Sequence, residues 1–334
     1  MKFDSHLFGL NAKWYVLGGI ILALCAALAH LARWHWSFDL LSHFLIQYAF
    51  FGFVFFVIFV LLKLPLLGVL MLMLSVFAYY ETRLPLTHPW QFTPPPRIET
   101  ERNLLRVVQY NKHYDNKNYT AIAQWLNNAS EPVDIALLLE VEPEDARALR
   151  SLTSGRYPYT QPAEGLGPDF SLILSRHPFL SMDVKKIAPS IIPTRGTRFE
   201  IQPEGFSRPV AFYTFHTRVP IAARGQAQRN AEIAGMAEWI AQDHSTDKIL
   251  AGDFNITPYS PYFYELKEKS GLQYQFYGVF PPATWVSYFV LPVLKIPIDH
   301  MLFGKGLDLL EIKAGPSFGS DHQALIGVFR PSSP

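Results

Sequence analysis

The stretch Lys248-Ile-Leu-Ala-Gly-Asp-Phe-Asn255 (KILAGDFN) is the most informative one for the fold of the part of the chain that follows Arg97. The run from Lys248 to Ala251 predicts a buried strand, and Asp253 and Asn255 follow its end after Gly252. Sheet scaffolds usually build active sites at strand ends, because the loops there are held by a rigid frame. The alternative role for Asp253 and Asn255 is an Asx turn.

Other short apolar runs repeat this pattern, and each leads to a polar residue. The runs and the residues that follow them are Leu104 to Tyr110 with Asn111, Ile135 to Leu139 with Glu140, Phe170 to Leu174 with Ser175-Arg176, Val210 to Phe215 with His216, Ile296 to Ile298 with Asp299-His300, and the loop Gly315 to Gly319 with Ser320-Asp321-His322 before a last strand, Ala324 to Phe329. Helical periodicity between the runs predicts helices at Tyr119 to Asn128, Glu144 to Leu152 and Arg224 to Gln242.

Taken alone, each polar residue has an ordinary structural explanation. A single Asp or His after a strand is usually a turn former or a cap. Glu140 is the strongest candidate, because a carboxylate after five apolar residues is costly to bury without a partner, although a surface loop would also explain it. His216 has the alternative role of a half-buried histidine with satisfied hydrogen bonds, and we interpret His113 and His177 as surface histidines.

The constellation is more informative than its members. One Asn, one Glu, two His and three Asp follow the predicted strands: Asn111, Glu140, His216, Asp253, Asp299, Asp321 and His322. Oxygen ligands suit a hard cation such as Mg²⁺ or Mn²⁺, and the imidazoles are available for proton transfer or phosphate contact. The sequence therefore predicts a divalent-metal site with histidines beside it.

The first 83 residues are more apolar than the rest of the 334-residue chain. They carry five basic and three acidic residues, and they account for much of the low charged fraction of the whole chain, 17% against about 25% in an average globular protein. Trp14 to Leu31 is uncharged and bounded by Lys13 and Arg33, which predicts a membrane-spanning helix at about 14–32. A cleavable signal peptide is the alternative for this run.

Two further apolar runs follow, and Lys63-Leu64-Pro65 separates them. Together they are too long for one crossing, so they predict a hairpin of two spans at about 45–62 and 64–80. The composition then becomes rich in proline, which predicts a semi-extended linker at 84–100. The transmembrane region is thus expected at 1–83 and a soluble domain at 101–334.

Charge and cysteine content exclude several classes of protein. From Arg97 onward there are 24 basic and 25 acidic residues, so the soluble domain lacks the positive field of a nonspecific nucleic-acid binder. One cysteine, Cys25, excludes an internal disulfide and a cysteine-based zinc site.

The motifs, in their order along the chain, resemble the endonuclease/exonuclease/phosphatase (DNase I-like) superfamily. The resemblance runs from about Leu104 to Phe329 and rests on Asn111, Glu140 in LLLEV, GDFN at 252–255, PIDH at 297–300 and GSDH at 319–322. Pro258, Ser260 and Pro261 after GDFN, with Thr284-Trp285, resemble a bacterial branch that carries N-terminal membrane helices. The resemblance implies an α+β fold: a sandwich of two mixed β-sheets flanked by helices, preceded by the transmembrane helical region.

The resemblance also implies a role for each candidate. Glu140 would bind the metal ion, assisted by Asn111 and, directly or through water, by Asp321. Asp253 would orient or deprotonate the attacking water, and Asn255 would donate a hydrogen bond to the phosphate.

The histidines and two arginines complete the implied site. His322, paired with Asp299, would be protonated and would stabilise the pentavalent phosphate, and His216 would lie near the leaving-group oxygen. Arg198 and Arg229 lie where relatives often carry substrate-binding basic residues. A surface salt bridge is the alternative for each.

The substrate class stays open between three hypotheses. The first and favoured one is a membrane-anchored phosphodiesterase or phosphatase acting on lipid head groups or small phosphoesters; the others are a Mg²⁺-dependent nuclease and a catalytically idle membrane adaptor. The aromatic segment Phe276 to Pro297, which includes Trp285 as a candidate for substrate binding, predicts either a lip that touches a bilayer or a core strand pair. The expected partners are the lipid bilayer and the phosphoester substrate, and no protein partner is inferable.

Membrane orientation follows from the number of spans. Three spans with a cytoplasmic N-terminus place the soluble domain on the extracytoplasmic side, because each span reverses the side of the chain. The expected location is the bacterial inner membrane, with the catalytic domain in the periplasm. The positive-inside rule gives almost no indication of the orientation, since equal numbers of basic residues flank the two sides of the predicted spans.

Overall fold

The computed structural model describes residues 6–7, 9–96, 103–129, 132–163, 170–189, 194–286 and 294–332. The chain forms two compact units. The helical unit comprises Met1–Pro85 and Thr257–Pro261, and the sheet unit comprises Leu86–Ile256 and Tyr262–Pro334.

The helical unit consists of four helices after a two-stranded pairing of β1 (His6–Leu7) and β2 (Leu10–Asn11). The helices are α1 (Ala12–Ala29), α2 (Trp36–Ser42), α3 (Leu45–Leu61) and α4 (Pro65–Arg83). The turn between α3 and α4 forms where it was expected, because Lys63 adopts a positive φ of 58° and Pro65 is tolerated in the first turn of α4.

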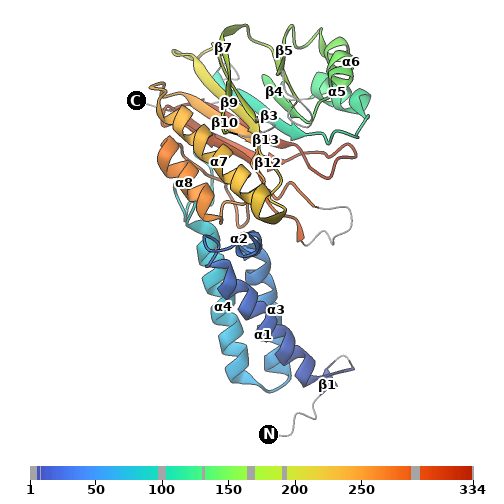
Figure 1. Ribbon diagram of the computed structural model, residues 1–334, viewed down its shortest axis with the longest axis vertical. Helices are drawn as coiled ribbons and strands as arrows, with labels where there is room; N and C mark the ends of the chain where they lie inside the picture. The colour runs from blue at the N-terminus through green and yellow to red at the C-terminus, as the bar shows by residue number, and fades with distance from the viewer. Residues whose placement is uncertain are drawn as a thin grey trace. The chain divides into compact units, whose positions relative to one another are not determined.

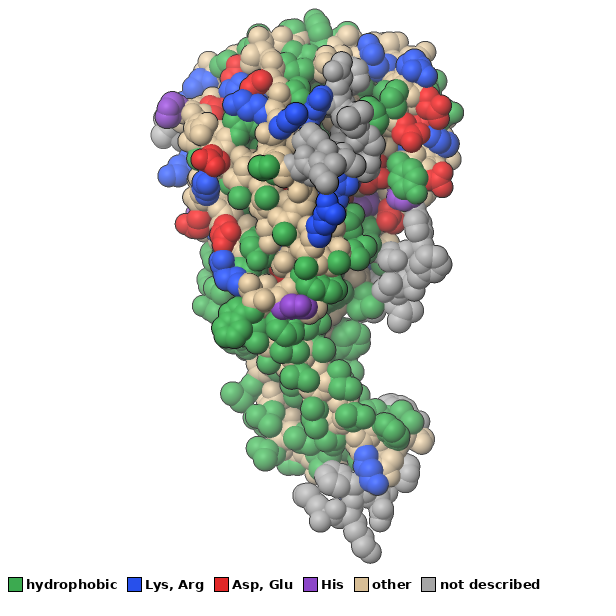
Figure 2. All heavy atoms as spheres, in the orientation of Figure 1, with side chains coloured by type: hydrophobic (Ala, Val, Ile, Leu, Met, Phe, Trp, Pro, Cys, Tyr) green, Lys and Arg blue, Asp and Glu red, His purple; other side chains and the backbone are tan. Residues whose placement is uncertain are grey.

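Two described helices, α1 and α4, are long and apolar enough to cross a membrane. The pair α2 and α3 is bent by 64° and passes the same test when the two are taken together, so it is a candidate for a third span. Hydrophobic side chains cover the visible surface of the helical unit (Figure 2). On α1 and α4, Ile20, Leu66 and Met73 are 59%, 73% and 63% exposed.

The sheet unit is built on two mixed β-sheets (Figure 1). The first has the strand order β11-β10-β9-β8-β7, with β7 (Phe179–Lys186), β8 (Arg195–Ile201), β9 (Val210–His216), β10 (Lys248–Asp253) and β11 (Asp299–Phe303). The second has the order β12-β13-β3-β4-β6-β5, with β3 (Leu105–Asn111), β4 (Ile135–Leu139), β5 (Tyr159–Ala163), β6 (Ser171–Ser175), β12 (Leu307–Ala314) and β13 (Leu325–Pro331). Among the described strands, β9–β10 and β3–β4 are the parallel pairs, and the other pairs are antiparallel.

Strand periodicity explains why these sheets stack as a sandwich with helices outside. Alternate residues of one strand face opposite sides: on β9, Val210 and Phe212 pack between the two sheets, whereas Tyr213 and Phe215 pack against helices. The helices of the sheet unit are α5 (Tyr119–Asn128), α6 (Pro143–Thr153), α7 (Ala222–Ala241) and α8 (Pro261–Ser270). The predicted DNase I-like α+β sandwich is confirmed.

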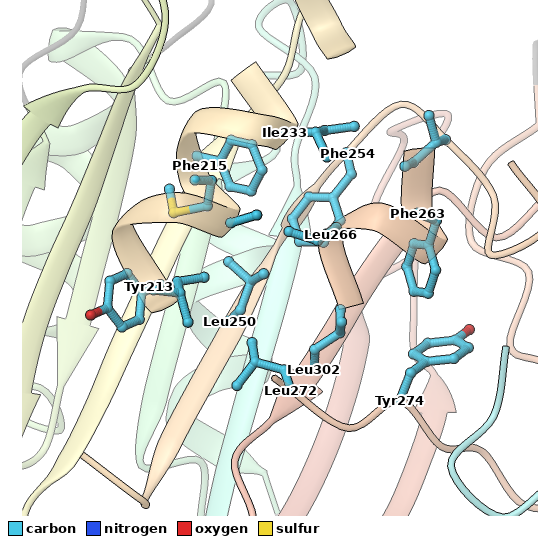
Figure 3. Packing of buried hydrophobic residues seen from close by; sticks show 14 of the residues in the cluster. Tyr213, Phe215, Ile233, Leu250, Phe254, Phe263, Leu266, Leu272, Tyr274 and Leu302 are labelled. Carbon is cyan, nitrogen blue, oxygen red and sulfur yellow. The ribbon is translucent and has the colours of Figure 1, made fainter. Parts of the chain in front are cut away.

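Helices α7 and α8 cover the outer face of the first sheet (Figure 3). Ile233 of α7 and Phe263 and Leu266 of α8 pack with Phe254 and Leu250 of the strand β10 region, and all five are at most 2% exposed. Burying a large apolar side chain contributes about 1.5–3 kcal/mol. This core therefore fixes the position of the loop that follows β10.

Two expectations differ from the structure. The Ile296 to Ile298 run is not a strand; β11 begins at Asp299 and runs antiparallel to β10. The first half of the expected linker is not a spacer: Leu86 is buried in the core of the sheet unit, the Thr87 N–H donates to the Tyr274 carbonyl, and the Gly278 N–H donates to the Phe92 carbonyl. The rest of the linker includes 97–100, which lie outside the described residues.

Candidate active site

Neighbouring strands bring the predicted polar residues to one edge of the two sheets. His216 at the end of β9 lies beside Asp253 at the end of β10, because the two strands are parallel. Asp299 lies on the other side of Asp253, because the antiparallel β11 starts where β10 ends. In the second sheet, the parallel strands β3 and β4 end at Asn111 and just before Glu140.

Unusual backbone conformations direct the side chains at this edge. A Cβ atom at Gly252 would lie 2.1 Å from the Phe215 carbonyl oxygen, so the close pairing of β9 and β10 requires glycine here. Glu140 and Asn255 have positive φ angles of 55° and 49°. Such residues cost about 1–3 kcal/mol each and cluster at functional sites, where the surrounding structure holds them.

His322 is held between two buried carboxylates. Its Nδ1 lies 2.8 Å from Asp299 Oδ2, and its Nε2 lies 3.6 Å from Asp253 Oδ2. Burial alone would lower the pKa of His322, but the charges of Asp299 and Asp253 raise it to about 10. Gln109 Nε2 donates to the other oxygen of Asp299 at 2.9 Å. His322 is thus an imidazolium at neutral pH, in a fixed orientation.

Asp253 is the most constrained carboxylate of the site. Its Oδ2 accepts a hydrogen bond from Asn111 Nδ2 at 3.0 Å, and its Oδ1 accepts one from the Asn255 N–H at 3.0 Å. Burial, with a contribution from Asp299, raises the pKa of Asp253 above its ordinary value, although His322 opposes this shift. A carboxylate with a raised pKa is a better general base at neutral pH.

Glu140 lies next to Asp253 and is bridged to it by Asn111. Asn111 Nδ2 donates to Glu140 Oε1 at 2.9 Å, and the Tyr114 N–H donates to Glu140 Oε2 at 2.9 Å. Burial would raise the pKa of Glu140, but His216 and these hydrogen bonds lower it, so the carboxylate is ionised. Asn111 Oδ1 accepts from the His113 N–H, so Asn111 orients both carboxylates, and its role as a metal ligand stays a prediction.

Asp321 supports the predicted divalent-metal site. Its Oδ2 accepts a hydrogen bond from Trp285 Nε1 at 2.9 Å, whereas its Oδ1 is buried and has no hydrogen-bond partner among the residues that the structure describes. An orphaned carboxylate oxygen that lines the same pocket as ionised Glu140 suits a hard cation. Glu140 and Asp321 therefore fit a divalent metal ion.

A second acidic cluster also has the spacing of a metal site. Ligand atoms of Asp253, Asp299 and His322 lie within 4.8 Å of one another. The protonated His322 already pairs with Asp299 there, and an imidazolium offers no lone pair to a metal. Glu140 and Asp321 are therefore the better candidates to hold a divalent metal ion.

His216 and Asn255 line the same pocket as Glu140 and Asp253. His216 Nε2 lies 3.5 Å from Asp253 Oδ2 and 3.8 Å from Glu140 Oε1. Asn255 Nδ2 lies 3.4 Å from the same histidine nitrogen and donates to the Thr217 carbonyl at 3.0 Å. These side chains line a pocket of about 320 Å³.

Sequence reasoning missed several residues that line this pocket. His113, interpreted as a surface histidine, lines it together with Tyr114, Arg218 and Val219. Arg218 is the only lysine or arginine among the described lining residues, and its backbone N–H donates to the buried carboxylate of Glu232 at 2.7 Å. The available signal was adjacency: His113 is two residues after Asn111, and Arg218 is two residues after His216.

The two arginines predicted to bind substrate have other positions. Arg198 lies three residues further back along the sheet than His216, about 10 Å at 3.3 Å per residue, and pairs with Glu200 and with Asp243 at 2.9 Å. Arg229 is fully buried, and its Nη1 donates to the Asn255 carbonyl at 3.1 Å. Arg198 is therefore part of a distant ion-pair network, and Arg229 positions the Asn255 backbone.

The aromatic segment has two parts with different roles. Phe276 is buried in the core with α7 and α8, as the core interpretation expected. Trp285 lines the pocket and orients Asp321 through its indole N–H. Residues 287–293, which include Tyr288 and Phe289, lie outside the described residues.

Comparison with known proteins agrees with this architecture. The sequence model of the endonuclease/exonuclease/phosphatase family matches residues 103–322. No curated protein sequence matches the chain.

Three solved structures illustrate the similarity of fold. An endonuclease/exonuclease/phosphatase from Beutenbergia cavernae has a TM-score of 0.56 at 17% identity, covering 70% of this chain and 72% of its own. Sphingomyelinase C from Streptomyces griseocarneus has a TM-score of 0.51 at 15% identity, covering 67% and 99%. TDP2 from D. rerio, complexed with a single-strand DNA product, has a TM-score of 0.55 at 15% identity, covering 68% and 99%.

Proposed function

Because the chain belongs to the endonuclease/exonuclease/phosphatase family, we propose that it is a membrane-anchored phosphoester hydrolase that depends on Mg²⁺ or Mn²⁺. One observation carries the proposal: the His322 imidazolium, fixed by Asp299 and Asp253, shares a small pocket with the ionised Glu140 and the orphaned oxygen of Asp321. Positive charge fixed beside an oxygen-rich ligand set is what a pentavalent phosphate with developing negative charge requires.

The chain's own residues divide the work of hydrolysis. Asp253 orients a water molecule and accepts its proton, since its pKa is raised and both its oxygens are held by hydrogen bonds. His322 donates to a phosphoryl oxygen as the charge there increases. Asn255 and His216, which line the same pocket, contact the phosphate. A divalent cation held by Glu140 and Asp321 would supply further positive charge to the phosphoryl oxygens.

The favoured substrate is a lipid head group or another small phosphoester. The pocket of about 320 Å³ is lined by Trp285, Tyr114 and Val219 and by a single arginine among the described residues. A duplex binder gains most of its affinity from several Lys and Arg contacts to phosphates, and the domain carries 24 basic and 25 acidic residues from Arg97 onward. The apolar helices favour substrates presented at a membrane.

The test is a phosphoester panel on the full-length protein in detergent. The panel contains a sphingomyelin, a glycerophospholipid, a nucleotide, a soluble aryl phosphodiester, and single- and double-stranded DNA, each with Mg²⁺, with Mn²⁺ and with EDTA. We expect hydrolysis that is lost in EDTA and restored by Mg²⁺ or Mn²⁺, with the highest kcat/KM on a lipid or small phosphoester. Full activity in EDTA would contradict the proposed metal dependence. DNA as the best substrate would favour the nuclease hypothesis over ours.

Membrane placement is part of the same proposal. We place the region up to Arg83 in a bacterial inner membrane as a multi-pass anchor, with residues from 101 onward as an extracytoplasmic catalytic domain. The apolar surfaces of α1 and α4 support the anchor, and the bent pair of α2 and α3, counted as one candidate span, would make the number of spans odd. A C-terminal reporter fusion that is active only in the cytoplasm would contradict this orientation.

A further inference from the structure

The segment Thr257–Pro261 connects the catalytic loop to the helical unit. Only Ile256 separates it from Asn255, yet the segment packs within the helical unit rather than within the sheet unit. Thr257 and Ser260 are fully buried, and Tyr259 is 7% exposed in a cluster with Ala26 and Ala78 of the apolar helices. The chain therefore enters the helical unit directly after its catalytic GDFN motif.

Two buried polar side chains from α2 and its C-terminal cap hold this segment. Ser260 Oγ donates to Asp39 Oδ1 at 2.8 Å, and both residues are fully buried. His43 Nδ1 accepts from Thr257 Oγ1 at 3.1 Å and from the Thr257 N–H at 3.4 Å. Because the backbone N–H can only donate, Nδ1 is the unprotonated ring nitrogen of His43.

These hydrogen bonds are energetically significant because the groups are shielded from water. Breaking a hydrogen bond between buried groups leaves a desolvated donor and acceptor, so the bond from Ser260 to Asp39 stabilises this position of the segment. The Ser260 N–H also donates to the Thr257 carbonyl at 3.2 Å, which closes a turn. The segment thus has one preferred conformation in the helical unit.

The sheet unit holds the preceding residue in the same rigid way. His300 Nε2 donates to the Ile256 carbonyl at 2.7 Å from within a cage of Phe254, Phe263 and Tyr274 rings. Burial lowers the pKa of His300 to about 4, so the ring is neutral at pH 7. Asn255, which directly precedes Ile256 in the chain, has a positive φ of 49°.

We propose that Asp39 and His43 are positioning residues for the catalytic loop, so that the helical unit is a working part of the hydrolase in addition to its anchor. They hold Thr257–Pro261, and that segment restrains the left-handed turn at Asn255 through one intervening peptide. The proposal rests on the proposed function, because the loop matters only if Asp253 and Asn255 act on a phosphoester. Helix rearrangements in the helical unit then change turnover at the site.

The experiment compares full-length variants in detergent. Ser260→Ala and Asp39→Ala remove the buried hydrogen bond, Asp39→Asn keeps an acceptor oxygen for Ser260, and Thr257→Val weakens the bond to His43. Ser75→Ala is the matched control, since Ser75 Oγ donates to the Ala49 carbonyl within the same helices without contacting the segment. We expect Ser260→Ala to lower kcat about tenfold with KM within twofold, as for a lost buried hydrogen bond that affects geometry, and Asp39→Asn to retain most of kcat.

Amide hydrogen exchange supplies a readout that does not need activity. We expect faster exchange in peptides covering 253–262 in Ser260→Ala than in wild type or Ser75→Ala, with unchanged exchange in β3 and β4 as evidence that the sheet unit is folded. If Asp39→Ala fails to fold, Ser260→Ala and Thr257→Val carry the test alone. Unchanged exchange together with unchanged kcat would overturn the proposal. Altered exchange in a protein that hydrolyses no phosphoester would support the loop coupling and overturn only the proposed function.

Discussion

The helical unit and the sheet unit distribute polar and apolar side chains in opposite ways. On the helical unit, large apolar residues such as Ile20 and Leu66 are exposed, whereas Asp39 and His43 are buried. On the sheet unit, apolar residues fill three buried clusters, and the visible surface carries interspersed Lys, Arg, Asp and Glu side chains (Figure 2). Exposed apolar surface is unfavourable in water and favourable in lipid. The difference supports the proposal that the helical unit lies in lipid and the sheet unit in water.

Buried polar groups have different purposes in the two units. In the sheet unit they gather at the strand ends, where Asp253, Asp299 and His322 form a charged network. In the helical unit they gather around the segment that follows that network along the chain. The predictions below change one feature of one unit at a time and compare it with a control.

The largest effect is expected from Asp253→Asn in the sheet unit. The amide keeps the shape and can keep hydrogen bonds of the carboxylate, but it cannot accept a proton from water, so we expect kcat to fall about 10²–10⁴-fold. The measurement is kcat on the best phosphoester of the panel, with the thermal midpoint as a check of folding. Asp183→Asn, an exposed carboxylate on β7, should leave kcat unchanged. A loss of only a few-fold in Asp253→Asn would mean that another group activates the water.

The next effect tests the solvent of the helical unit. Ile20 lies at the middle of α1 and is 59% exposed, so, if α1 spans a membrane as proposed, Ile20→Lys would place a charge at the centre of that span, at a cost of about 2.5–3.5 kcal/mol. We expect a smaller fraction of this variant in carbonate-washed membranes. Leu180→Lys is the control, because Leu180 is 54% exposed on β7 of the sheet unit, and we expect no change. An equal fraction of the two variants in the washed membranes would contradict the proposal that the two units lie in different solvents.

The third effect concerns substrate binding by Arg218. Its backbone is fixed by Glu232, and its side chain lines the pocket, so Arg218→Gln should raise KM about tenfold, as expected for loss of one hydrogen bond to a charged group, with kcat within threefold. Arg224→Gln, on the exposed first turn of α7, is the matched control. An unchanged KM in Arg218→Gln would exclude Arg218 from substrate binding.

Much of the sheet unit was predictable, because its core strands are continuous apolar runs. Ile135–Leu139 and Val210–His216 are buried along their whole length, and the family motifs follow them. The missed strands have mixed or polar sequences: β7 is an edge strand whose residues, among them Asp183 and Lys185, are mostly exposed. Periodicity gives little signal for such a strand, since its neighbour on the sheet supplies most of its stability.

The residues that gather at the candidate site were predictable, and the arginines beside them were less so. Asp253 ends a buried strand and His322 precedes one, but whether an arginine lies near them depends on long-range packing. Arg198 is directed into a network with Asp243, and Arg218 into the pocket, by their places on and after two neighbouring strands. Local sequence holds no information on that choice. The packing of Thr257–Pro261 in the helical unit was equally invisible, because its partners are more than 200 residues away in the sequence.

The smallest effect tests the ion-pair network around Asp243 on the sheet unit. Asp243 accepts hydrogen bonds from Tyr213 at 2.6 Å, from Arg198 at 2.9 Å and from the Ser245 N–H at 2.8 Å. Burial alone would raise the pKa of Asp243, but these hydrogen bonds hold it well below its usual range. A depressed folded pKa contributes stability that is present above the unfolded value of about 3.9 and is lost as the pH falls through the folded pKa.

Asp243→Asn should therefore lower the free energy of unfolding by about 1–2 kcal/mol at pH 7, which is a few degrees in the apparent thermal midpoint. The difference from wild type should shrink progressively below about pH 4. KM should stay unchanged, because Arg198 lies away from the pocket. A difference that is the same at pH 7 and pH 3 would show that the charge of Asp243 contributes nothing, and a raised KM would return Arg198 to the substrate site.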